Sequence, residues 1–135
     1  MKKIFLFILA IGLLSFSYAQ DRWTVKINSK TLLTAKKEDT ALNVVSIADI
    51  KKGSLVVSYT PGKMQSEWGR RLVIYDLADN ELYAKEAFNI TIPAATLKKW
   101  KKNHSQIKIY TWPVSKDPRI KLKVRRVHLC TINFT

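Results

Sequence analysis

Short runs in which apolar and polar residues alternate recur along this chain, and a period of two predicts β-strands rather than helices. In the run from Trp23 to Ile27, every second residue is apolar. Similar runs, separated by turn residues, occupy 31–35, 42–47, 54–60, 71–77, 81–84, 88–92, 106–112 and 120–134. About seven to nine short strands spaced in this way favour two packed sheets. We therefore expect an all-β fold, an immunoglobulin-like β-sandwich.

The last run, 120–134, changes its pattern halfway. In its first half the apolar residues occupy even-numbered positions, whereas beyond Arg126 both odd and even positions are apolar. A β-bulge inserts one residue into a strand and turns the following side chains to the other face. We expect one long final strand, or two strands joined by a bulge near Arg125 and Arg126.

One segment departs from the strand pattern. Pro93 precedes an Ala- and Lys-rich stretch, and proline suits the first turn of a helix. Leu97 and Trp100 are three residues apart, so both can pack on one side of a helix while the lysines stay in water. The sequence predicts one short helix near residues 94–102, crossing between strands.

The first nineteen residues have the three parts of a secretory signal peptide. Lys2 and Lys3 precede an apolar run of about 13 residues, which is shorter than the ~20 that a membrane-spanning helix needs. Ser17 and Ala19 then suit a cleavage site for small residues. We expect residues 1–19 to be removed and 20–135 to form a single β-sandwich domain, either periplasmic or secreted. The alternative is an uncleaved membrane anchor.

Cys130 is the one cysteine, so no disulfide can form within the chain and packing alone must hold the domain. We expect its thiol to be buried, because its neighbours are apolar. His128 lies two residues away, on the same face of a strand, which invites comparison with blue copper sites. The order of ligands does not fit, since Met64 lies far upstream and no His follows Cys130. We expect no metal and no cofactor.

The chain also lacks a recognisable catalytic arrangement. No Gly-x-Ser-x-Gly elbow is present in the sequence. Asp76, Asp79 and Glu81 lie close together, but Asp and Asn are expected at a tight turn for backbone reasons alone. We expect a protein that is not an enzyme.

Charge is the most informative bulk property. The chain has 24 Lys and Arg against 10 Asp and Glu, and without Lys2 and Lys3 the balance is 22 against 10, or +12. Such an excess attracts polyanions, which outside the cytoplasm include polysaccharide, lipopolysaccharide and nucleic acid.

Two groups of basic residues stand beside tryptophans. They are Lys98, Lys99, Lys101 and Lys102 around Trp100, and Arg119, Lys121, Lys123 and Arg125 after Trp112. On a strand the second group would form a ladder with a spacing of about 6.7 Å. Lysine and arginine would neutralise a polyanion, and Trp100 and Trp112 could add stacking. We expect a non-catalytic binding module for an extracytoplasmic polyanion.

Two alternatives remain at this point. The basic residues can be a solvated face that guards exposed strand edges, a common role of lysine. The domain can also be an accessory protein that docks to another exported protein through an open sheet edge. Partners retained at high salt would favour docking, because contacts to polyanions weaken steeply with salt.

A short motif at residues 39–41 suggests a modification. Asp39-Thr40-Ala41 is similar to the tripeptide that some Gram-negative bacteria O-glycosylate after export. Thr40 is therefore a candidate glycosylation site.

Several stretches together resemble a known group of proteins. They are Leu32-Leu33-Thr34-Ala35 with Glu38-Asp39, Ile109-Tyr110-Thr111-Trp112, and Val124-Arg125-Arg126-Val127-His128-Leu129-Cys130. The chain resembles a group of small exported bacterial proteins of unassigned function. This resemblance implies an exported domain and carries over no catalytic residue.

Overall fold

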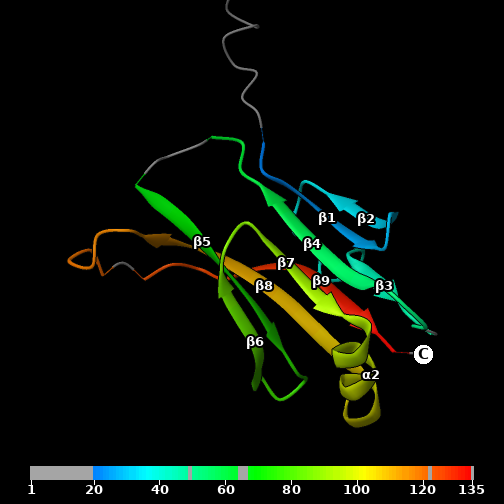
Figure 1. Cartoon of the computed structure of the whole chain (residues 1–135). Helices are drawn as coiled ribbons and strands as arrows, with labels where there is room; N and C mark the ends of the chain where they lie inside the picture. Colours follow the sequence, from blue (N-terminus) through cyan, green and yellow to red (C-terminus); the bar gives the residue numbers. More distant parts are fainter. Residues whose placement is uncertain (1–19, 49, 64–66, 122, 135) are drawn as a thin grey trace, which may run out of the picture.

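The computed structural model of the chain describes residues 20–48, 50–63, 67–121 and 123–134. The predicted signal peptide, residues 1–19, and Met64 lie outside these ranges. The described residues form nine strands and one helix, and the strands make two sheets (Figure 1). No helix among them has the length and apolar character needed to cross a membrane.

The first sheet has four antiparallel strands. Its order is β2 (Lys30–Ala35), β1 (Arg22–Ile27), β4 (Ser54–Thr60) and β7 (Asn89–Pro93). The second sheet has five strands, in the order β3 (Val44–Ser46), β9 (Val127–Asn133), β8 (Gln106–Ser115), β5 (Trp68–Tyr75) and β6 (Glu81–Glu86). All its pairs are antiparallel except β3 with β9, which run parallel.

The chain crosses between the two sheets three times after β4. It passes from β4 to β5, returns from β6 to β7, and crosses again through the helix to β8. Crossings of this kind give the Greek-key connections of immunoglobulin-like sandwiches. The predicted all-β sandwich, with seven to nine strands and one short helix, is confirmed.

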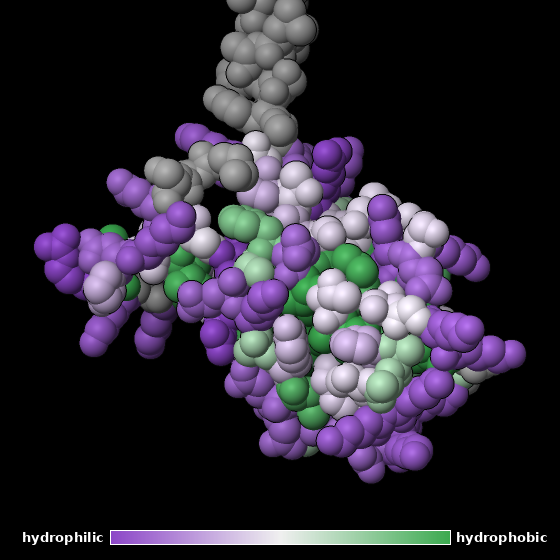
Figure 2. Space-filling model, viewed as in Figure 1, coloured by the Kyte–Doolittle hydropathy of each residue, from purple (hydrophilic) through white to green (hydrophobic). Residues whose placement is uncertain are grey.

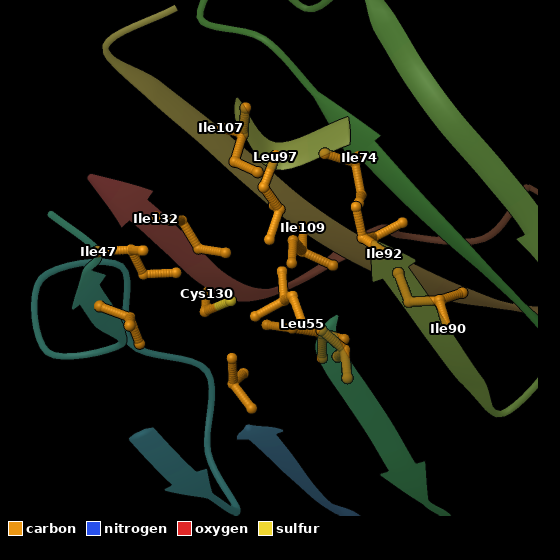
Figure 3. Packing of buried hydrophobic residues seen from close by; sticks show 14 of the residues in the cluster. Ile47, Leu55, Ile74, Ile90, Ile92, Leu97, Ile107, Ile109, Cys130 and Ile132 are labelled. Atoms are coloured by element: carbon orange, nitrogen blue, oxygen red, sulfur yellow. The ribbon is translucent and has the colours of Figure 1, made fainter. Parts of the chain in front are cut away.

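The core lies between the sheets and is built by the alternation seen in the sequence. Leu55 and Val57 of β4 face Ile107 and Ile109 of β8, and all four are fully buried. Figure 3 shows such side chains converging from strands of both sheets. One hydrogen bond also links the sheets, because the indole N–H of Trp23 donates to the carbonyl of Leu129 at 2.9 Å.

Helix α2 (Ala94–Asn103) forms where it is predicted. It turns Leu97 and Trp100 toward the core and leaves its lysines outside. Lys101 and Lys102 lie in its last turn, where positive charge is favourable to the helix dipole. The helix therefore closes one end of the sandwich (Figure 1).

The predicted final strand is wrong in its first half. Strand β9 begins at Val127, and the described residues of 116–126 belong to no strand. We call residues 116–121 and 123–126 the arm. Strand β8 instead continues to Ser115, past the residue at which the sequence predicts its end, because β5 starts early enough to pair with it.

The bulge lies in a different place from the prediction. The register between β8 and β9 shifts between Ile109 and Tyr110, opposite Cys130 and His128, so the extra residue is Leu129. The predicted position near Arg125 and Arg126 precedes the strand. Within β9, residues on both faces are buried.

Candidate functional site

The predicted basic residues form two groups that lie far apart. In Figure 1 helix α2 lies at the lower right, whereas the arm projects at the far left. Figure 2, in the same view, shows mostly hydrophilic side chains over that projecting part, with hydrophobic ones among them. The two groups therefore do not form one continuous surface, and each has to be judged by its own surroundings.

The lysines of α2 surround a tryptophan that is not available for stacking. Trp100 is only 8% exposed, because the helix packs by burying it with Leu97, so its predicted role as a stacking platform is wrong. Lys98 donates to the carbonyl of Lys51 at 3.4 Å, and Lys101 donates to that of Ala48. These bonds join the helix to the loop before β4.

Lys99 and Lys102 are exposed on the same helix. Neither lysine lines the hollows beside the arm that are described below, and binding by the α2 lysines stays a prediction.

The arm does not carry a strand-borne ladder, and two of its four predicted cations have local partners. Arg119 is paired with Asp117 at 3.0 Å, and this guanidinium holds the pKa of the Asp117 carboxyl below its ordinary value. Arg125 lies 2.7 Å from Glu38. Lys121 and Lys123 are exposed and make no hydrogen bond or ion pair with any described residue.

A cleft lies beside the arm because strands β5 and β8 extend beyond the strands that flank them. Strand β6 ends opposite Arg71 of β5, and β9 begins opposite Thr111 of β8. Beyond these points Trp68–Arg70 and Pro113–Ser115 pair only with each other. We call this two-stranded segment the β5–β8 extension. The first sheet stops at Arg22 and Thr60, so no strand among the described residues lies opposite the inner side of the extension.

The cleft has a volume of about 670 Å³, within the ordinary range for a small-molecule site. One wall comes from the β5–β8 extension, and the other from the end of the first sheet. Its apolar lining is Pro61, Trp68, Phe88, Pro113 and Val124, and its charged lining is Asp21, Lys63, Arg70 and Lys116.

Arg70 lines the cleft and is fixed there by two contacts. By the alternation of β5 it faces the same way as the buried Leu72. Its guanidinium carbon lies 4.2 Å from the ring centroid of Tyr59, and its Nε donates to Thr111 at 3.1 Å. The cation thus caps the apolar core at its open end.

Asp21 is the one carboxylate among the described lining residues, and its oxygens already accept hydrogen bonds within the protein. It accepts hydrogen bonds from the hydroxyl of Tyr59 and from the backbone N–H of Gly62, the latter at 2.7 Å. Burial, together with this bond, holds the pKa of Tyr59 above its ordinary value. These bonds occupy both oxygens of Asp21 but leave its negative charge, so the described lining carries three cations, Lys63, Arg70 and Lys116, against one anion.

A second, smaller hollow of about 220 Å³ lies beside the first. Trp68, Pro113 and Val124 line both. The smaller hollow adds Trp112 and Lys121, two residues that the sequence analysis assigned to one binding surface. Trp112 of β8 and Lys121 of the arm, two of the predicted site residues, therefore line one hollow.

Sequence reasoning missed most of the cleft lining. Trp68 and Lys63 lie outside the alternating runs, and Phe88 counted only as the start of the predicted strand 88–92. The one available clue was the loop opened by Pro61-Gly62 between two predicted strands, because long loops often carry function.

The comparison with copper sites fails on geometry as well as on order. Because the register shifts at Leu129, Cys130 faces the core and His128 faces the other side of β9, so the predicted shared face is wrong. His128 lies 2.8 Å from the hydroxyl of Thr131, and burial holds its pKa below the ordinary value. The described part of the chain contains no group of three or more His, Cys, Asp or Glu arranged to hold a metal.

Thr40 is exposed, as a modification site requires. The carboxylate of Asp39 accepts the backbone N–H groups of Ala41 and Leu42, both at 3.0 Å, and so fixes the turn that presents Thr40. Glycosylation of Thr40 stays a prediction.

Comparison with known proteins adds no relative to this description. No protein-family model, no curated protein and no solved structure matches the chain. The candidate site therefore rests on the geometry of the cleft and the arm.

Proposed function

We propose that residues 20–135 are an exported, non-catalytic module that binds an extracytoplasmic polyanion through the cleft and the arm. The observation that carries the proposal is the β5–β8 extension, whose uncovered inner side forms a cleft with three cations and one engaged carboxylate. The arm continues this positive surface with Lys121 and Lys123.

Shape favours the arm over the helix as the binding surface. Lys121 and Lys123 form no ion pair with a described residue, and the same holds for Lys99 and Lys102, so what distinguishes the arm is the hollow that Lys121 lines. A concave site holds a ligand by several contacts at once. Lys99 and Lys102 of helix α2 are exposed and line neither hollow, so we assign them to the solvated face.

The test is binding of the mature protein to heparin, lipopolysaccharide and DNA over a series of salt concentrations. We expect binding to at least one of them at low salt, with the logarithm of affinity falling linearly against the logarithm of salt concentration. Absence of binding to all three at low salt would contradict the proposal and make the excess charge a solvated surface.

A second candidate function is docking to another exported protein. Among the described residues β2 pairs only with β1, so its outer edge is open to an added strand. Lys30, Lys36 and Lys37 flank this edge and oppose uncontrolled pairing. Cross-linking and pull-down from the native host separates the two functions: a protein partner that stays bound at high salt favours docking.

A further inference from the structure

The arm has an apolar side as well as a charged one. Ile120 is 44% exposed and Val124 is 38% exposed. Both line the smaller hollow, and Val124 lines the large cleft too. Lys121 and Lys123 lie between them in the sequence. The arm is therefore an extended amphipathic segment beside a cleft.

The cleft walls repeat this combination. Trp68, Phe88 and Pro113 are apolar, and Phe88 is 36% exposed. Lys63 and Lys116, both exposed, stand among them. A fully hydrated polyanion such as a sulfated sugar would use these cations and leave the apolar walls in contact with water. The walls are useful only to a ligand that has an apolar part.

We propose that the ligand of this site is an anionic amphiphile, a phosphate that carries an acyl chain, with the chain in the cleft. This inference rests on the proposed function, because the same cations hold the phosphate. Burial of apolar surface then adds to a charge interaction that is weak by itself in water.

Alkyl phosphates of one chain length, used below their micelle-forming concentration, test the inference. The probes are decyl phosphate, inorganic phosphate and decanol, and binding to mature wild-type protein is measured by calorimetry. Each buried methylene strengthens binding about fourfold. We therefore expect decyl phosphate to bind at least a hundredfold tighter than inorganic phosphate, and tighter than decanol.

Two variants test whether the alkyl chain of decyl phosphate lies in the cleft, and a third variant serves as the control. Phe88→Ser and Val124→Ser change exposed residues of the lining, and each should weaken decyl phosphate binding at least tenfold while leaving heparin binding nearly unchanged. Leu77→Ser is the matched control, because Leu77 is 56% exposed in the turn between β5 and β6, outside the cleft. It should bind like wild type, and circular dichroism should show all three folded.

The outcomes separate this inference from the proposed function. If heparin binds with the expected salt dependence but decyl phosphate binds no tighter than inorganic phosphate, the amphiphile is wrong and the polyanion function stands. If Leu77→Ser weakens the binding of decyl phosphate as much as Val124→Ser does, the alkyl chain does not enter the cleft. If decyl phosphate, heparin, lipopolysaccharide and DNA all fail to bind at low salt, the proposed function is wrong as well.

Discussion

Arg125 Nη1 lies 2.7 Å from Oε2 of Glu38, although 87 residues separate them in the sequence. The other oxygen of the same carboxylate accepts the backbone N–H of His128 at 2.9 Å. Glu38 thus ties the end of the arm and the start of β9 to the segment after β2. The pKa of Glu38 is held below its ordinary value of 4.5, chiefly by the His128 N–H and also by Arg125.

We predict that Glu38→Gln destabilises the protein by about 1 kcal/mol at pH 7, because an amide oxygen accepts the His128 N–H more weakly and loses the ion pair. A carboxylate whose pKa is lowered on folding stabilises the folded state above its unfolded pKa. This contribution is lost as pH falls through the folded pKa. The difference between wild type and variant in urea denaturation should therefore shrink below about pH 4.5.

Glu86→Gln is the control for the Glu38 prediction, because the carboxylate of Glu86 is 65% exposed and lies 4.0 Å from Arg71. It should change stability little at either pH. A Glu38→Gln effect that is the same at pH 7 and at pH 3 would contradict the role given to the carboxylate.

We predict that Trp23→Phe costs about 1–3 kcal/mol, because the variant keeps an aromatic ring but leaves the buried carbonyl of Leu129 without its indole donor. Trp112→Phe is the matched control, since Trp112 is half-buried and its indole makes no hydrogen bond to a described residue. Urea denaturation at constant m-value measures both. Equal costs would mean that the bond between the sheets contributes nothing.

Cys130 should be chemically inert in the folded protein. It is fully buried, and burial raises the pKa of its thiol to about 12, so almost no thiolate exists at neutral pH. We predict no reaction of the native protein with Ellman's reagent at pH 8, and reaction of one equivalent after denaturation in guanidinium chloride. Rapid reaction of the native protein would show that the core opens around β9.

Export makes a prediction about the N-terminus. Mass spectrometry of the protein recovered from its native host should find a chain that begins at Gln20. Intact Met1 in a membrane fraction would instead support the anchor that the sequence left as the alternative.

The sequence predicts well those elements whose pattern is local. β4 (Ser54–Thr60) and α2 are found where expected, because alternation and the spacing of Leu97 and Trp100 report directly on which side is buried. The ends of β8 and β9 depend on a partner strand, and periodicity carries no information about partners. Alternating residues in the arm therefore look like a strand although no described strand pairs with them.

The cleft is hidden from the sequence for a related reason. Pro113 favours a loop, but at that position β8 has a neighbour on one side only, and an edge tolerates proline. The cleft exists because β5 and β8 are longer than the strands around them, which is a property of the assembled sheets. The excess of positive charge can be counted from the sequence. That its residues lie on two separate parts of the surface, the arm and α2, can be seen only in the folded structure.

The most direct test of the account compares two double variants with equal loss of charge. Lys121→Ala/Lys123→Ala removes two lysines from the arm, and Lys99→Ala/Lys102→Ala removes two from the helix. Heparin affinity is measured for both, and for wild type, over the same salt series. We predict that the arm variant binds more weakly with a log–log slope shallower by up to about 2, and that the helix variant keeps nearly the wild-type slope. Identical slopes and affinities in the two variants would contradict a site on the arm, because only overall charge would then be acting.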